Sequence, residues 1–137
     1  MPLHAKAEQT LRRWHEMVAA QDLGQVATLC TRDIVFRSPV AFTPYQGAEL
    51  VAAFLQQALQ TFDDFRYHRT FSDGEQSIVL EFSASVAGKE LKGIDMIRFD
   101  EQGLMADFEV MVRPATGLQA LGAEMARRMG PLLAPKP

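Results

Sequence analysis

The sequence has a single cysteine, Cys30, and no excess of basic residues. One cysteine cannot form an intrachain disulfide or a zinc site built on cysteine pairs, and we expect Cys30 to be a small buried apolar residue. The chain has 14 Lys and Arg residues against 17 Asp and Glu, with a formal net charge of −3. A sequence-independent grip on nucleic acid needs a basic surface, so the composition argues against a nucleic-acid partner.

Long hydrophobic runs are also missing. The longest uncharged apolar run, Leu50 to Phe62, is interrupted by glutamines, whereas a membrane span needs about 20 apolar residues, so no membrane partner is expected. The first six residues lack the apolar core of a signal peptide, which favours a cytoplasmic location. The 137 residues are the size of one domain. We place that domain at residues 1–130, followed by a proline-rich tail at 131–137.

Helical periodicity occurs near both ends of the chain and in the middle. The first helix is predicted around Ala7–Val18, with Trp14 on its apolar face. Asp22 is placed to cap a short second helix. A long helix over Ala48–Phe62 has a broad apolar stripe, and a last one over Thr116–Met129 ends at Gly130-Pro131.

Most of the remaining chain alternates between apolar and polar residues, which is typical of strands. Helices followed by a run of antiparallel strands indicate an α+β fold. We expect a long, curved antiparallel sheet wrapped around a helix, which would leave an internal cavity, and a loop over Pro39–Gly47. The predicted strands are Asp33–Ser38, Phe65–Phe71, Ile78–Val86, Leu91–Phe99 and Leu104–Arg113.

Asp95 is the strongest candidate for a functional residue. The alternation places it on the same strand face as Gly93 and Ile97, in otherwise apolar surroundings. A carboxyl group there is costly unless it is paired, hydrated or protonated, and desolvation would raise its pKa. The alternative is a structural carboxyl bonded to Trp14, Arg69 or a backbone amide.

The other candidates are the residues expected to form the pocket walls. Arg69 shares a face with Tyr67 by alternation; it is expected either to reach Asp95 or a ligand carboxylate, or to emerge at the rim. The three histidines show no metal-ligand spacing, so no metal and no cofactor are predicted. The predicted ligand-binding residues are Phe36, Phe54, Tyr67, Arg69, Leu80, Phe82, Val110 and Val112.

Three local strings carry a resemblance to a known superfamily. They are residues 32–39 (RDIVFRSP), Gly47 at the start of the long helix, and residues 93–100 (GIDMIRFD) with Gly103 closing the next turn. This pattern resembles the nuclear transport factor 2-like superfamily, which includes SnoaL-like polyketide cyclases and steroid delta-isomerases. The resemblance implies a cone around a deep pocket. The outer sheet face is a mixture of charged residues and the apolar residues Val79, Ile94, Met96 and Met111, which suggests a homodimer interface, as is usual in this superfamily. The alternative is that the C-terminal helix covers this face.

The steroid delta-isomerases give the sharpest comparison. Their pattern has an aspartate base, and a tyrosine with a protonated aspartic acid that donate to an oxyanion. On this chain the acid falls on Asp95, the tyrosine on Trp14, and the base on Ser38. A serine hydroxyl cannot take a carbon proton near neutral pH without a base of its own, so standard ketosteroid isomerase activity is not expected. Gly93 stands where the similar limonene epoxide hydrolases carry an arginine.

The resemblance therefore implies a pocket for a small hydrophobic, oxygen-bearing compound. Asp95, Trp14 and Ser38 are the predicted catalytic or polar contacts, and proton transfer or hydration is the expected chemistry, with Asp95 as acid/base or oxyanion donor. The alternative is a non-catalytic ligand-binding or dimerisation module on the same scaffold.

Overall fold

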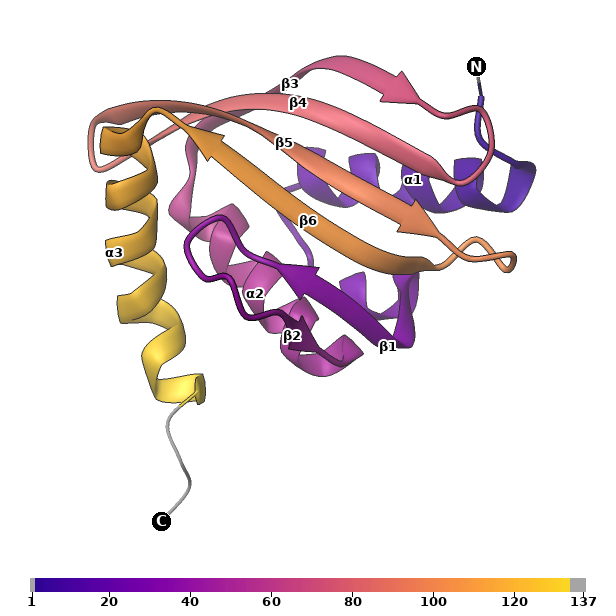
Figure 1. Cartoon of the computed structure of the whole chain (residues 1–137), viewed down its shortest axis with the longest axis horizontal. Helices are drawn as coiled ribbons and strands as arrows, with labels where there is room; N and C mark the ends of the chain where they lie inside the picture. Colours follow the sequence, from indigo (N-terminus) through magenta and orange to yellow (C-terminus); the bar gives the residue numbers. More distant parts are fainter. Residues whose placement is uncertain (1, 134–137) are drawn as a thin grey trace.

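The structure, a computed structural model, describes residues 2–133 (Figure 1). Three α-helices and a six-stranded sheet account for most of these residues. In chain order the elements are α1 (Ala5–Ala19), the 3₁₀ helix η1 (Val26–Leu29), β1 (Cys30–Arg37), β2 (Tyr45–Gln46), α2 (Ala48–Thr61), β3 (Asp63–Ser72), β4 (Ser77–Val86), β5 (Lys89–Phe99), β6 (Met105–Arg113) and α3 (Ala115–Leu133).

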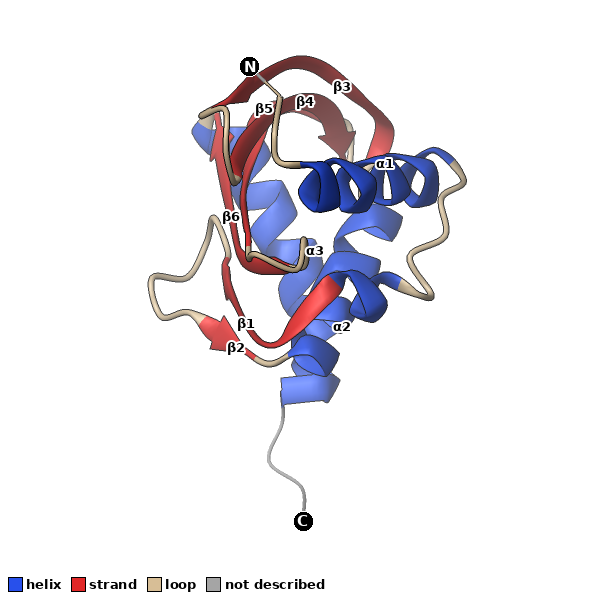
Figure 2. Ribbon diagram, turned by 90° about the vertical axis from the view of Figure 1, so that its right-hand side faces the viewer, coloured by secondary structure: helices blue, strands red, loops and turns tan. Residues whose placement is uncertain are grey.

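The six strands form one curved sheet in the order β2-β1-β6-β5-β4-β3. Strands β3 to β6 bend around α1, and the helices lie on the concave side (Figure 2). The predicted α+β cone is confirmed, with one difference: β1 pairs with β6 in parallel, so the sheet is mixed. The helix α2 and three hairpin-connected strands separate β1 from β6 in sequence, and this long connection permits the parallel pairing.

Apart from shifts of a few residues at the strand ends, two local features differ from the predictions. A short strand, β2, lies inside the stretch predicted as a loop, where Tyr45 pairs with Phe36. The predicted stop at Gly130-Pro131 is wrong, because α3 continues to Leu133. A proline this close to the helix end removes only one intrahelical hydrogen bond. Residues 131–133 of the predicted tail are therefore helical, and residues 134–137 lie outside the described part of the chain.

The inner face of β5 follows the predicted alternation. Gly93, Asp95 and Ile97 are buried on that face, and Asp95 is 6% exposed. In register, Asp95 lies between Leu80 of β4 and Val110 of β6. The alternation of a strand that is buried on one face thus places a carboxyl group in the apolar interior.

The placement of Arg69 on the inner face of β3 is wrong. Four residues of β3, Tyr67 to Thr70, lie opposite three residues of β4, Phe82 to Leu80. This extra residue is a β-bulge, and it turns the following side chains to the opposite face. Arg69 therefore bonds Glu81 on the outer face, at 2.9 Å from Nε to Oε1.

The outer face of the sheet is uncovered in the described part of the chain. Helix α3 packs on the inner face, where Leu121 joins Leu91 and Phe82 in an apolar cluster. Met111 is 45% exposed on the outer side. Ile94 separates it from Glu81 on the same face, and Glu81 also bonds Lys92. The homodimer through this face stays a prediction.

Candidate functional site

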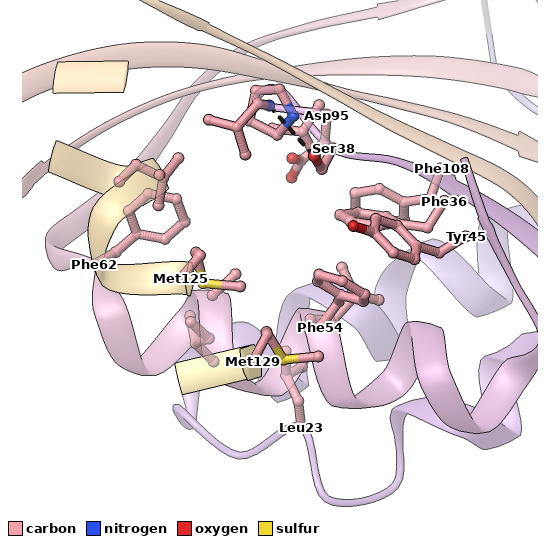
Figure 3. Close-up of a pocket in the computed structure, with 18 of the residues that line it drawn as sticks. Leu23, Phe36, Ser38, Tyr45, Phe54, Phe62, Asp95, Phe108, Met125 and Met129 are labelled. Carbon is pink, nitrogen blue, oxygen red and sulfur yellow. Dashed lines mark hydrogen bonds between the residues drawn. The ribbon is translucent and has the colours of Figure 1, made fainter. Parts of the chain in front are cut away.

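A cavity of about 350 Å³ lies between the curved sheet and the helices. Figure 3 shows Asp95 and Ser38 at one end of it and Met129 and Leu23 at the other. The rest of the wall is aromatic or aliphatic, so the cavity is apolar with a small polar end, as is usual in small-molecule sites. Contributors include Phe36 of β1, Phe54 and Leu55 of α2, Phe82 of β4, Phe108 of β6, and Met125 of α3.

Most of the predicted site residues line this cavity. Leu80 and Val112 do not: Leu80 is fully buried in the main core, and Val112 packs against the second apolar cluster. Arg69 faces the other side of the sheet, as described above. The predicted residues that do line the cavity are Trp14, Phe36, Ser38, Phe54, Tyr67, Phe82, Asp95 and Val110.

Three side chains from different elements form a hydrogen-bond chain at the polar end. The indole N–H of Trp14 in α1 donates to the Tyr67 hydroxyl at 3.0 Å. The Tyr67 O–H then donates to Asp95 Oδ2 at 2.6 Å. Asp95 therefore does not bond Trp14 or Arg69 directly, as the alternative proposed, but bonds Tyr67. The other carboxyl oxygen, Oδ1, has no hydrogen-bond partner among the described residues.

The pKa of Asp95 is raised from its ordinary 3.8 to about 7. Desolvation is the main cause, because an ionised carboxylate is poorly solvated in an apolar wall. The hydrogen bond from Tyr67 opposes it by stabilising the ionised form. The pKa of Tyr67 is well above its usual 10, through burial and the adjacent Asp95 carboxylate. Tyr67 therefore stays a neutral donor, while Asp95 exchanges its proton near neutral pH.

Ser38 lies just beyond the end of β1 and is fixed by its own turn. Its Oγ accepts hydrogen bonds from the backbone N–H groups of Val40 at 3.3 Å and Ala41 at 3.0 Å. No histidine or carboxylate bonds this hydroxyl among residues 2–133, so nothing there would make it a base. The same residues hold no group of three or more His, Cys, Asp or Glu side chains placed to bind a metal ion.

Part of the cavity wall comes from residues that the sequence did not predict as site residues. Tyr45 lines it from the short strand β2, with its ring 4.4 Å from that of Phe54 between centroids. Two residues are too few to show alternation, so the sequence carried no strand signal there. Leu121, Met125 and Met129 of α3 also line the cavity. Their spacing in the sequence is that of one helical face, but the sequence does not show that this face borders the cavity.

Replacing Tyr67 with Phe should raise the pKa of Asp95 further above 7. The change removes the O–H that stabilises the carboxylate, and a hydrogen bond to a charged group contributes roughly 1.5 to 3 kcal/mol. The measurement is the pH titration of an isotope-labelled Asp95 carboxyl by NMR. Trp14→Phe is the control, since it removes a donor to Tyr67 but leaves the Tyr67–Asp95 bond. An unchanged midpoint in Tyr67→Phe would contradict the assigned role of the hydroxyl.

The fold and the cavity define the class of protein. A curved sheet around three helices, with an apolar cavity on its concave side, is the architecture of NTF2-like α+β domains. The profile of the SnoaL-like domain family matches residues 11–108. The chain belongs to the SnoaL-like domain family. No helix in the described residues has the length and apolar character needed to cross a membrane.

Solved structures agree with this assignment. A steroid delta-isomerase from Pseudomonas aeruginosa is 54% identical, with a TM-score of 0.93 over 98% of this chain and 99% of that one. An uncharacterised protein with a cystatin-like fold from Silicibacter pomeroyi is 35% identical, with a TM-score of 0.83 over 88% and 85%. An NTF2-like protein from Mesorhizobium loti, 14% identical with a TM-score of 0.71 over 83% and 100%, shows the fold alone. The comparison with curated proteins finds no match.

Proposed function

We propose that this protein binds a small apolar carbonyl compound in the cavity and moves a proton between two of its carbon atoms. Asp95 is the acid-base group in this proposal. The observation that carries it is the placement of Asp95: it is buried in the wall of an apolar cavity, bonded only through Oδ2, with Oδ1 unpartnered among the described residues.

The proposed reaction balances without a cofactor. The ionised Asp95 removes a proton from the carbon next to the carbonyl group, and the electron pair of that C–H bond moves into an enolate. The neutral Asp95 then returns the same proton to another carbon of the conjugated system. A pKa of about 7 suits both steps, because a general acid-base group works best when its pKa is near the working pH.

Two further facts support this reaction class. The structure that is 54% identical over nearly the whole chain is described as that of a steroid delta-isomerase. The Tyr67 hydroxyl also keeps Asp95 in one orientation, because its short bond to Oδ2 leaves Oδ1 for the ligand. The departure is Ser38, which stands where the isomerase pattern has its base. The proposal therefore gives the base role to Asp95.

The test is the conversion of a β,γ-unsaturated cyclohexenone to its conjugated isomer, followed by ultraviolet absorbance. Asp95→Asn should reduce kcat/KM by roughly 10²-fold or more, the usual contribution of one acid-base group. The wild-type rate should rise with pH through about 7, as Asp95 ionises. Asp33→Asn, a change at an exposed position of β1, is the matched control and should keep the wild-type rate.

A second function, ligand binding without catalysis, is favoured by one observation. Asp95 is the one carboxyl group among the described residues that line the cavity, so the two-carboxyl arrangement of the isomerase pattern is absent. The same assay separates the two functions. Binding of an apolar ketone with no conversion above the background rate, in wild type and Asp95→Asn alike, would support the binding module and remove Asp95 from any mechanism.

A further inference from the structure

The hydrogen-bonding capacity of Ser38 is almost fully used by its own turn. A serine hydroxyl has two lone pairs and one proton. Both lone pairs accept backbone N–H groups, from Val40 and Ala41. The proton is the one part left, and no acceptor among the described residues takes it. Because Ser38 lines the cavity, this proton is available to an acceptor atom of a ligand.

The strand register places Ser38 and Asp95 on either side of one residue. Phe36 pairs with Phe108 and Arg37 with Glu109 along β1 and β6. Ser38 is the first residue after β1, and the same register continued by one position sets it beside Val110. Val110 itself pairs with Asp95. Neighbouring strands are about 4.8 Å apart, so the two backbones are about 10 Å apart and both side chains face the concave side. A ligand lying across Val110 reaches both groups.

The other donors at this end of the cavity are already engaged. The Trp14 N–H is donated to Tyr67, and the Tyr67 O–H is donated to Asp95. When Asp95 is ionised it has no proton to donate. Tyr45 also lines the cavity. However, its strand β2 lies on the side of β1 away from Asp95, and Tyr45 pairs there with Phe36, which precedes Ser38 by two residues. By strand order, the Ser38 hydroxyl is therefore nearer to the ionised Asp95 than the Tyr45 hydroxyl is.

We propose that the Ser38 hydroxyl binds the carbonyl oxygen of the ligand and so fixes which of its carbon atoms meets Asp95. This inference rests on the proposed function and adds the orientation of the substrate. The oxygen lies on the β1 side, and the acidic carbon lies on the β5 side, at Asp95 Oδ1. Ser38 and Asp95 thereby exchange the donor and base roles that the isomerase pattern assigns to these two positions. The site selects apolar ketones over hydrocarbons of the same shape.

Two probes of similar shape test the role of Ser38. Acetylnaphthalene carries a carbonyl group, and ethylnaphthalene does not. Ser38→Ala should weaken acetylnaphthalene binding roughly five- to tenfold, the fold-change expected for one neutral hydrogen bond, and leave ethylnaphthalene binding unchanged. The infrared stretch of an isotope-labelled carbonyl in bound acetylnaphthalene should move to higher frequency in Ser38→Ala. Ser38→Thr, which keeps a hydroxyl, should restore both values.

The remaining variants decide where the oxygen lies. The carbonyl stretch of each variant is compared with that of wild type at a pH where wild-type Asp95 is ionised. Tyr45→Phe and Asp95→Asn should each shift the stretch less than Ser38→Ala does. A larger shift in either of them, or no shift in Ser38→Ala, would overturn the proposal. Ser38→Ala could bind neither probe because its turn is disrupted, and Ser38→Thr then decides. A carbonyl stretching frequency equal to that of wild type in Ser38→Thr supports the proposal, and a different frequency overturns it. Failure of the proposed function is distinct: the Ser38 effects on binding persist while wild type converts no cyclohexenone.

Discussion

As the pH rises from about 4 to about 8, the buried Asp95 carboxyl should lower the unfolding free energy of the wild-type protein by roughly 4 kcal/mol. Asp95→Asn should not show this loss. The pKa of Asp95 is about 7 in the folded protein, against an ordinary value of 3.8. The folded state thus binds the proton more tightly than the unfolded chain. Below about pH 4 the carboxyl is neutral in both states and carries no penalty. The penalty grows as the pH rises and is complete above about pH 7.

Urea unfolding of the two proteins at several pH values measures this effect. The quantity is the difference in unfolding free energy between Asp95→Asn and wild type, in which the titration of other groups cancels. It should increase in favour of Asp95→Asn up to about pH 7 and then stay level. Glu81 acts with the opposite sign and at lower pH, because its ion pairs with Arg69 and Lys92 lower its pKa to about 2. A difference independent of pH would show that Asp95 is not buried as a carboxyl in an apolar wall.

Gly93→Ala should destabilise the protein by about 3 kcal/mol, the upper part of the range for overpacked interiors. A Cβ at this position would lie 2.4 Å from the Met111 carbonyl oxygen and 2.6 Å from Phe82 Cζ. The carbonyl belongs to the neighbouring strand β6, so rotation of a side chain cannot relieve that contact. The Phe82 ring is stacked on Phe65, with centroids 5.0 Å apart, and moving it would disturb the cavity wall.

The control for this change is Gly130→Ala in α3, where a Cβ meets no atom within 4 Å. Alanine in a helix is more favourable than glycine by about 0.5 to 1 kcal/mol, so this variant should match or exceed wild-type stability. Chemical denaturation of both variants gives the comparison. Wild-type stability in Gly93→Ala would mean that β5 and β6 can separate at this point. The same crowding explains why the arginine of the epoxide hydrolase pattern has no place at position 93.

Local sequence patterns were sufficient for most of the scaffold. Helical periodicity located α1 and α2 to within a few residues, because each buries one continuous apolar stripe. Alternation placed Asp95 on the inner face of β5, since a strand buried on one face repeats every two residues. Both signals need only neighbouring residues.

Alternation did not predict the orientation of side chains in β3, where one extra residue alters the two-residue period. The bulge between Tyr67 and Thr70 moved Arg69 to the outer face, and an extra residue leaves no mark in the composition. Phe71 follows the bulge and is apolar, as a core residue would be, yet it is 54% exposed. It packs under Arg69, whose guanidinium carbon is 5.6 Å from the ring centroid. A surface aromatic under a cation thus imitated a core residue.

The sequence by itself determined that one carboxyl group would be buried on an apolar strand face and that no base would precede Pro39. Only the tertiary structure decided what surrounds that carboxyl. Tyr67 reaches Asp95 across an intervening strand, and Trp14 reaches Tyr67 from a helix 53 positions away in the chain. Such contacts depend on sheet curvature and on strand register, which are set by the packing of all the elements together and not by the residues next to each group.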